Sequence, residues 1–240
     1  MTSVEFAYAT HPGRKRSLNE DSLCIEPELS LWAVADGMGG HASGEVASGL
    51  VVQELPRQIR EGKALASAIL DTHRAIHRAA GLGQGGHDMG STVVAARLRG
   101  LSYQIAWVGD SRAYLWNGAL RQLTRDHSYV QLLWEAGLIE EADMASHPGR
   151  NVISQALGGS EHQEIKVDVV SGELSPGDSL LLCSDGLNSE VPDAEIARIL
   201  SSTPNTSARV DRLVDAALEA GGNDNITVVL LTARNGRAFD

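Results

Sequence analysis

The chain has 240 residues, a length typical of one domain, and its 42% hydrophobic and 21% charged residues are ordinary for a globular protein. Thirty-one acidic residues against 20 basic ones give a formal net charge of −11 at pH 7. This balance argues against binding to nucleic acid or to an anionic membrane surface, because both need clustered lysine and arginine. It leaves room for a basic partner or for metal cations.

No segment has the pattern of an export signal or a membrane span. The first 16 residues lack the long apolar region of a signal peptide, and no uncharged apolar run approaches the ~18 residues that a span needs. The two cysteines, Cys24 and Cys183, are too few for a disulfide framework. Both lie in apolar runs, as small core residues of a reducing compartment do. We therefore expect a cytoplasmic protein with no membrane partner.

Hydrophobic periodicity and turn residues predict the following elements in chain order. They are a strand at 31–35, helices at 44–59 and 64–80, strands at 91–98, 102–108, 113–116 and 119–123, a helix at 128–136, a strand at 179–184, helices at 193–200 and 208–220, and a strand at 226–233. Asn117-Gly118 is a strong hairpin signal. Pro56 is expected to kink or end the first helix. Ser128 with Gln131 has the spacing of a capping box.

The order of these elements predicts an α+β fold in a single domain spanning residues 1–240. Hairpins imply antiparallel sheets, and helices that come in pairs suggest layers that cover sheet faces rather than βαβ crossovers. We therefore expect sheets packed in the middle of the molecule and helices outside them.

Aspartates recur where apolar strands begin or end. Four of them lie in glycine- or asparagine-rich turns at strand ends, and a fifth follows Asn19-Glu20; they are Asp36, Asp110, Asp185, Asp224 and Asp21. One Asp-Gly turn means only a turn, but several that bound buried strands suggest a shared site. Two like charges about 4 Å apart repel by roughly 1 kcal/mol in water and about 4 kcal/mol at an effective dielectric of 20. A converging set therefore needs protons or cations.

An all-oxygen ligand set favours Mg²⁺ or Mn²⁺ over Zn²⁺. Two such ions activate a water molecule for hydrolysis and stabilise charge on phosphoryl oxygens, which makes phosphate esters the natural substrates. A phosphoryl site also favours an arginine, whose planar fork matches phosphate oxygens. Arg16, five residues before Asp21, is the candidate.

Four sequence blocks resemble the PPM family of metal-dependent serine/threonine phosphatases (protein phosphatase 2C), of the compact bacterial type. They are RSLNEDS at 16–22, DGMGGH at 36–41, VGDSR at 108–112, and SDGL at 184–187 paired with GNDNIT at 222–227. They occur in family order and span nearly the whole chain. The segments THPG at 10–13 and LWAVAD at 31–36 are also similar to phosphatases encoded with type VI secretion systems.

The resemblance implies a four-layer αββα sandwich, with two central antiparallel sheets and the metals in a cleft at one end. By position, Asp36 would bridge two ions, the Gly37 carbonyl would bind one of them, and Asp185 and Asp224 would complete the other. Glu20 and Asp21 would act mainly through metal-bound waters, Arg16 would hold the substrate phosphate, and Asp110 with Asp185 would bind a third ion. Residues 127–153 resemble the family's flap, whose exposed and charged composition suits a loop that gates a cleft or selects a partner.

The chain departs from the family pattern at two positions. Many eukaryotic members have a histidine as candidate general acid where this chain has Met38, and His41 is the nearest substitute in sequence. Bacterial members often have an aspartate where this chain has Ser189. The first departure leaves the general acid open, and the second leaves the third ion open.

Simpler interpretations remain for single residues. Any one of the strand-end aspartates alone is explained by turn chemistry, and Asp110 by an ion pair with Arg112. Glu20 is equally well a solvated neighbour of Asp21, Arg16 a surface charge in the basic run 14–16, and His41 a loop histidine.

Two functions follow from these patterns. The first is a phosphatase that acts on phosphoserine and phosphothreonine in proteins with two or three Mn²⁺ or Mg²⁺ ions, works as a monomer and opposes a bacterial serine/threonine kinase or acts on its targets. The second is a non-catalytic phosphoprotein-binding module on the same fold, suggested by Met38 and Ser189.

Overall fold

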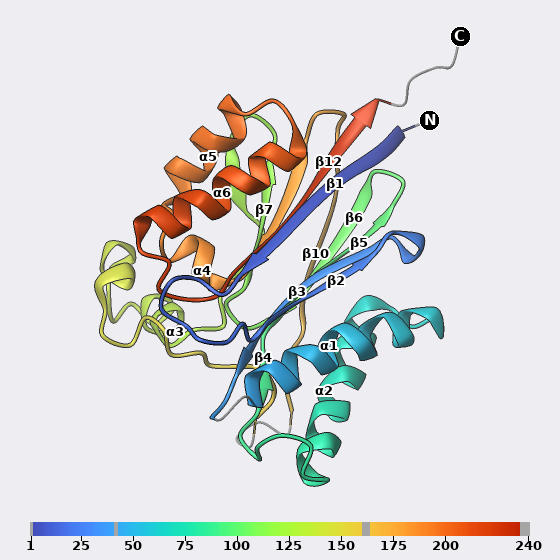
Figure 1. Ribbon diagram of the computed structural model, residues 1–240, viewed down its shortest axis with the longest axis vertical. Helices are drawn as coiled ribbons and strands as arrows, with labels where there is room; N and C mark the ends of the chain where they lie inside the picture. Colours follow the sequence, from blue (N-terminus) through green and yellow to red (C-terminus); the bar gives the residue numbers. More distant parts are fainter. Residues whose placement is uncertain (1, 41–42, 160–163, 236–240) are drawn as a thin grey trace.

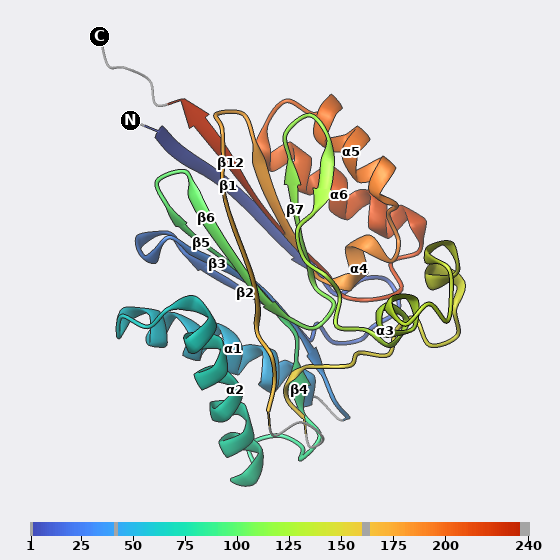
Figure 2. The same ribbon diagram turned by 180° about the vertical axis from the view of Figure 1, so that it is seen from behind.

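Two antiparallel sheets form the centre of the molecule (Figures 1 and 2). The computed structural model describes residues 2–40, 43–159 and 164–235. In spatial order, the first sheet consists of β1 (Thr2–His11), β12 (Ile226–Asn235), β11 (Ser179–Cys183), β7 (Arg112–Trp116) and β8 (Leu120–Gln122). The second consists of β10 (Asp168–Glu173), β6 (Ser102–Val108), β5 (Val93–Arg99), β3 (Leu31–Met38), β4 (Gly90–Ser91) and β9 (Leu157–Gly158), with β2 (Asp21–Glu26) also paired to β3.

Helix pairs cover the outer faces of both sheets (Figure 1). Helices α1 (Ser43–Arg60) and α2 (Leu65–Gly81) pack on the second sheet, and α5 (Asp193–Ser202) and α6 (Thr206–Ala220) pack on the first. The shorter elements are η1 (Pro27–Leu29), α3 (Tyr129–Glu135), η2 (Glu141–Ser146) and α4 (Asp185–Asn188). The expected four-layer αββα sandwich is therefore confirmed.

Side-chain alternation along the central strands creates three apolar layers. Leu180 and Leu182 of β11 face the layer between the sheets, whereas Leu181 and Cys183 face the layer under α5 and α6. The third layer lies between α1, α2 and the second sheet. Because both faces of these strands are buried, their sequences are almost continuously apolar. The rigid sandwich fixes the strand ends, where the polar residues gather.

The predicted helices are all present, but three long strands were missed. Strands β1, β2 and β10 mix polar and apolar residues, and each has only one strand neighbour, so one edge is free and the apolar pattern is weak. The predicted strand at 91–98 is two strands, β4 and β5, separated at Thr92. Helix α1 continues past Pro56 to Arg60, so of the two expected effects of Pro56, an end of the helix at that residue does not occur.

The predicted cap of α3 forms in one direction. The backbone amide of Gln131 donates to Ser128 Oγ at 3.3 Å. The side-chain amide of Gln131 donates to Glu135 and does not return to Ser128.

Among the helices described, none has the length and apolar character needed to cross a membrane.

Candidate active site

The aspartates predicted from the sequence lie at one end of the sandwich, where strands of both sheets begin or end. Asp36 is near the end of β3 and Asp21 begins β2, and the two are direct cross-strand partners. The other three flank the central strands: Asp110 follows β6, Asp185 follows β11, and Asp224 precedes β12. This is the end of the sheets near α3, α4 and β4 in Figures 1 and 2.

Asp36 is fixed through its backbone. Its amide donates to Thr92 Oγ1 at 3.0 Å, and its carbonyl accepts from the Thr92 amide at 2.8 Å and from Ser91 Oγ at 3.1 Å. The Thr92 hydroxyl is in turn 2.7 Å from Ser111 Oγ. The break between β4 and β5 thus positions Asp36 and leaves its carboxylate available to a ligand.

Ser184 joins the two sheets at Asp21. Its hydroxyl donates to Asp21 Oδ2 at 2.7 Å and accepts from the Thr227 amide at 3.0 Å. The other oxygen, Asp21 Oδ1, is buried without a hydrogen-bond partner in the described part of the chain, and Asp110 Oδ1 is in the same condition. Buried acceptors are normally satisfied, so two orphaned carboxylate oxygens at one strand-end site indicate a place for a cation.

Burial and mutual repulsion raise the pKa values of these carboxyls. Burial is the main cause for each, and the neighbouring carboxylates add to it. The pKa of Asp185 rises to about 6, that of Asp21 to about 7 and that of Asp110 to about 8. The pKa of Asp36 lies well above its usual range, after burial because of Asp21, Asp185, Asp110 and Asp224. These groups therefore share one electrostatic environment, which a divalent cation would neutralise.

The residues present fit hard divalent cations. The donors are carboxylate oxygens and the Gly37 carbonyl, which is the chemistry that Mg²⁺ and Mn²⁺ prefer. Across residues 2–40, 43–159 and 164–235, no three His, Cys, Asp or Glu side chains already surround one point closely enough to hold an ion. The backbone therefore brings the ligands to one place, and rotation of the carboxylate side chains must complete a coordination sphere.

Arg16 lies at the open side of this cluster. Its Nη2 donates to Asp224 Oδ2 at 2.8 Å, and both side chains are partly exposed. The pair raises the pKa of Arg16, first through this hydrogen bond and then through the charge of Asp224. An exposed guanidinium next to buried carboxylates suits an anionic ligand that approaches from solvent.

Asn225 holds the loop that carries Arg16 and Glu20. Its side-chain oxygen accepts from the Glu20 amide at 2.7 Å, and its Nδ2 donates to the carbonyls of Pro12 at 3.0 Å and Leu18 at 2.9 Å. The side chain is buried. Asn225 belongs to the block GNDNIT at 222–227, but its role could not be predicted from the sequence, because these partners lie more than 200 residues away.

Glycines allow α1 to approach the site closely. A Cβ on Gly37 would come within 2.0 Å of the Gly44 carbonyl oxygen and 2.6 Å of the Glu20 carbonyl oxygen. A Cβ on Gly44 would come within 2.7 Å of Glu20 Oε1. The Glu20 carboxylate thus lies against the first turn of α1, beside Gly37.

A cavity of about 320 Å³ adjoins the carboxylates. Asp110, Asp185 and Ser189 line one side, and Glu141, Met144 and Arg150 from the segment 127–153 line the other. The segment is anchored by His127, whose Nδ1 accepts from the Gly109 amide at 3.1 Å and whose Nε2 is 3.2 Å from Asp168. The Gly109 contact makes Nδ1 the acceptor, so Nε2 carries the proton that is donated to Asp168.

The structure brings together Arg16, Glu20, Asp21, Asp36, Gly37 and the three later aspartates, as expected. The alternative pairing of Asp110 with Arg112 is wrong, because Arg112 forms its ion pair with Asp126. Met38 has no proton to donate, and His41 lies outside the described residues. The roles of Ser184, which belongs to the block SDGL, and of Thr92 could not be predicted from the sequence, because they depend on contacts across strands.

Comparison with known proteins agrees with this geometry. The model of the family described as protein phosphatase 2C matches residues 11–221. The chain is 39% identical over 238 residues to the serine/threonine phosphatase stp of Listeria innocua, covering 93% of this chain and 94% of that protein.

Two solved structures extend the likeness. One is the catalytic domain of the serine/threonine protein phosphatase PstP in complex with two manganese ions, with a TM-score of 0.86, 33% identity, and coverage of 98% of this chain and all of that one. The other is PppA, a key regulatory component of T6SS in Pseudomonas aeruginosa, with a TM-score of 0.82, 37% identity, and coverage of 96% and 97%. The chain belongs to the protein phosphatase 2C family.

Proposed function

We propose that this chain hydrolyses phosphoserine and phosphothreonine in proteins, with Mn²⁺ or Mg²⁺ held by the strand-end carboxylates. The observation that carries the proposal is the convergence of five aspartates from both sheets, two of them with buried oxygens that lack partners. The serine/threonine phosphatases among the relatives favour catalysis over a non-catalytic binding module.

We assign the residues as follows. Asp36, the Gly37 carbonyl, Asp185 and Asp224 would hold two ions, and Glu20 and Asp21 would act through water. When bound, the cations supply Lewis-acid activation of water and neutralise charge on the phosphoryl oxygens. Arg16, exposed at the rim, binds and orients the phosphate by charge-assisted hydrogen bonds.

A third ion is part of the proposal. Asp110 and Asp185 line the same cavity, and Asp110 Oδ1 is one of the orphaned buried oxygens. Ser189 lines that cavity as well and offers a neutral hydroxyl where a carboxylate would bind more strongly. We therefore expect the third ion to be held more weakly than the other two.

The segment 127–153 contributes to substrate choice in this proposal. It supplies Glu141, Met144 and Arg150 to the wall of the cavity next to the carboxylates. These side chains are positioned to contact the polypeptide around a phosphorylated residue. We propose that this segment acts as the flap of the enzyme within one domain spanning residues 1–240.

We further propose that the chain acts as a cytoplasmic monomer that opposes a serine/threonine kinase. Support for a reducing compartment comes from Cys24 and Cys183, both buried and free. The likeness to PppA supports a role in a type VI secretion system.

The test is a metal titration of phosphatase activity on a phosphothreonine peptide. Wild type, Asp36→Asn and the charge-matched control Asp215→Asn, at an exposed position of α6, are compared in parallel. Activity that requires Mn²⁺ or Mg²⁺, falls at least a thousandfold in Asp36→Asn and persists in Asp215→Asn supports the proposal. Wild type without activity at any metal concentration would reject it.

A further inference from the structure

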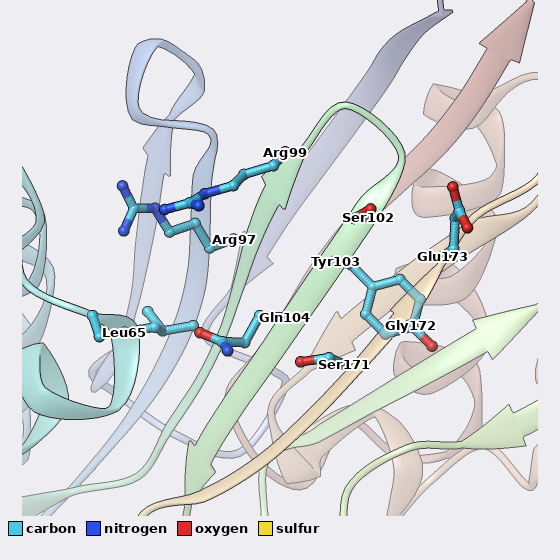
Figure 3. Close-up of a pocket in the computed structure, with 10 residues that line it drawn as sticks. Leu65, Arg97, Arg99, Ser102, Tyr103, Gln104, Ser171, Gly172 and Glu173 are labelled. Carbon is cyan, nitrogen blue, oxygen red and sulfur yellow. The ribbon is translucent and has the colours of Figure 1, made fainter.

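A second cavity lies away from the carboxylates (Figure 3). It has a volume of about 720 Å³ and lies beside the start of α2, over β5, β6 and β10. Arg97 is paired with Leu31, five residues before Asp36 on β3. Five strand residues span about 17 Å, so the cavity is well separated from the candidate active site.

Strand register places the polar side chains of this cavity on one face of the second sheet. On this face, Ala95 of β5, two residues before Arg97, and Ala106 of β6, two residues after Gln104, lie under α1 and α2. Toward the β5–β6 turn the same face carries polar residues in two cross-strand rows. The rows are Arg97, Gln104 and Ser171, and Arg99, Ser102 and Glu173.

The two arginines of this cavity lack acidic partners. In the described part of the chain, neither Arg97 nor Arg99 forms an ion pair, and the one side-chain hydrogen bond of the two joins Arg97 Nη1 to the Lys63 carbonyl at 3.4 Å. A guanidinium has five N–H donors, so most of these donors are free. Figure 3 shows both side chains directed toward the same end of the cavity. Among the described residues, two guanidiniums without ion pairs thus share one wall of this cavity.

Neutral donors lie on the same wall. The Gln104 amide follows Arg97 across the sheet, and the hydroxyls of Ser102 and Ser171 line the cavity. The combination of two guanidiniums with hydroxyl and amide donors suits a phosphate monoester, whose oxygens accept several charge-assisted hydrogen bonds.

The opposite end of the cavity has the opposite charge. Glu173 lies two strands from Arg99 in the same cross-strand row, with Ser102 between them, and Figure 3 draws it on the side of the cavity away from the arginine pair. This carboxylate repels a polyanion such as nucleic acid and favours a basic group. The volume also exceeds what a single phosphate ion needs and falls in the range of sites for larger ligands. A polypeptide segment with a phosphorylated residue near a basic one satisfies both ends.

We infer that the cavity between α2 and the β5–β6–β10 face is a docking site for a phosphorylated polypeptide, with the phosphate at Arg97 and Arg99. The inference rests on the proposed function for its choice of ligand, because a phosphoprotein phosphatase meets such segments. Occupation of this site holds a multiply phosphorylated substrate while another phosphorylated residue enters the cleft at Asp36.

Binding is measured by fluorescence anisotropy with a labelled phosphothreonine peptide that contains a neighbouring arginine. The protein carries Arg16→Ala and Asp36→Asn and is kept in chelator, so that the candidate active site neither binds nor cleaves the peptide. Into this background the double change Arg97→Gln/Arg99→Gln is introduced. The control is Arg121→Gln, which removes one positive charge at an exposed position of β8 on the other sheet.

Relative to the background protein, we expect the dissociation constant for the peptide to rise at least tenfold in the double variant and to stay within twofold in Arg121→Gln. In the background protein it should also rise with salt concentration. Circular dichroism melting checks that the double variant folds like the wild type. Equal affinity of the folded double variant, equal binding of the unphosphorylated peptide, or stronger competition by an oligonucleotide than by the peptide would overturn the inference. If inorganic phosphate saturates the cavity but the peptide does not bind, the occupant is not a polypeptide and the inference is wrong.

The failure of this inference is distinguishable from failure of the proposed function. Arg97→Gln/Arg99→Gln in the otherwise unchanged enzyme should hydrolyse p-nitrophenyl phosphate at the wild-type rate and show at least a fivefold higher KM for a doubly phosphorylated peptide. An unchanged KM would count against docking. Absence of p-nitrophenyl phosphate hydrolysis in the wild type would count against the enzyme and leave the anisotropy experiment interpretable.

Discussion

Asp21 and Asp36 are direct cross-strand partners, one at the start of β2 and the other near the end of β3. Like charges opposite each other destabilise an antiparallel pair, and burial makes the repulsion stronger. Hydrogen bonds relieve it in part, because Ser184 donates to Asp21. The arrangement lowers the stability of the fold without a cation and concentrates negative charge, which a cation site requires.

The first prediction concerns stability against pH in chelator. The pKa values of Asp21 and Asp110 are about 7 and about 8 in the folded chain, whereas an unfolded aspartate has a pKa near ~3.9. The folded state therefore binds more protons between these values, and stability falls as pH rises from about 4 to about 8. Melting temperatures in EDTA across this window should decrease, and Mn²⁺ added at pH 8 should raise them.

A variant isolates the contribution of one carboxyl. Asp110→Asn removes a group whose deprotonation is costly, so its melting temperature should depend less steeply on pH than that of the wild type. A melting temperature that rises from pH 5 to pH 8 in EDTA would contradict the electrostatic account.

The second prediction concerns Arg16. Arg16→Ala should lower kcat/KM for a phosphothreonine peptide by about 10- to 100-fold, the effect of losing a hydrogen bond from a charged group worth about 1.5–3 kcal/mol. Its ion pair with Asp224 is largely exposed, so unfolding free energy should change by at most about 1 kcal/mol. The neighbouring exposed Lys15 provides the control, and Lys15→Ala should leave kcat/KM within twofold. Equal losses in both variants would indicate a general charge effect instead.

The third prediction separates positioning of the site from stability. Asn225→Ala removes three hydrogen bonds that hold the loop bearing Arg16 and Glu20, and should lower the free energy of unfolding by about 2–4 kcal/mol. Activity should fall strongly at temperatures where the variant is folded. Asn205→Ala removes the N-cap bond of α6 and should cost about 1 kcal/mol while activity persists. Full activity of folded Asn225→Ala would show that the loop does not need this anchor.

The fourth prediction tests the close approach of α1 to the site. Gly37→Ala places a methyl group 2.0 Å from the Gly44 carbonyl oxygen, so α1 or β3 must move. We expect a loss of at least about 3 kcal/mol in unfolding free energy and loss of metal-dependent activity. Gly49→Ala, within α1, places its methyl group in open space and should stabilise the chain by up to about 1 kcal/mol. If Gly37→Ala melts like the wild type, the helix is not packed this tightly against the strand end.

The long central elements could be predicted from the sequence because their burial leaves a local pattern. Strand β6 was predicted with the observed bounds, and α1 and α2 within one residue at each end. Strand β1 could not, because its polar residues mask the alternation and its pairing with β12 joins residues more than 200 positions apart. Helix α1 passes through Pro56, which is buried, so burial in the folded chain outweighs the local tendency of proline to end a helix.

The chemistry proposed for the site could be predicted from the residues alone. Asp36, Asp185 and Asp224 lie where apolar runs meet glycine or asparagine, and such boundaries are visible locally because these residues interrupt hydrophobic runs. In the structure, Asp36 lies near the end of β3, Asp185 begins α4 and Asp224 precedes β12. Which groups meet depends on how the chain folds. The facing of Asp21 and Asp36, the hydrogen bond from Ser184 to Asp21, and the position of Arg97 and Arg99 on one face all depend on strand register and on the packing of two sheets. Those contacts are long-range, and no local pattern of residues specifies them.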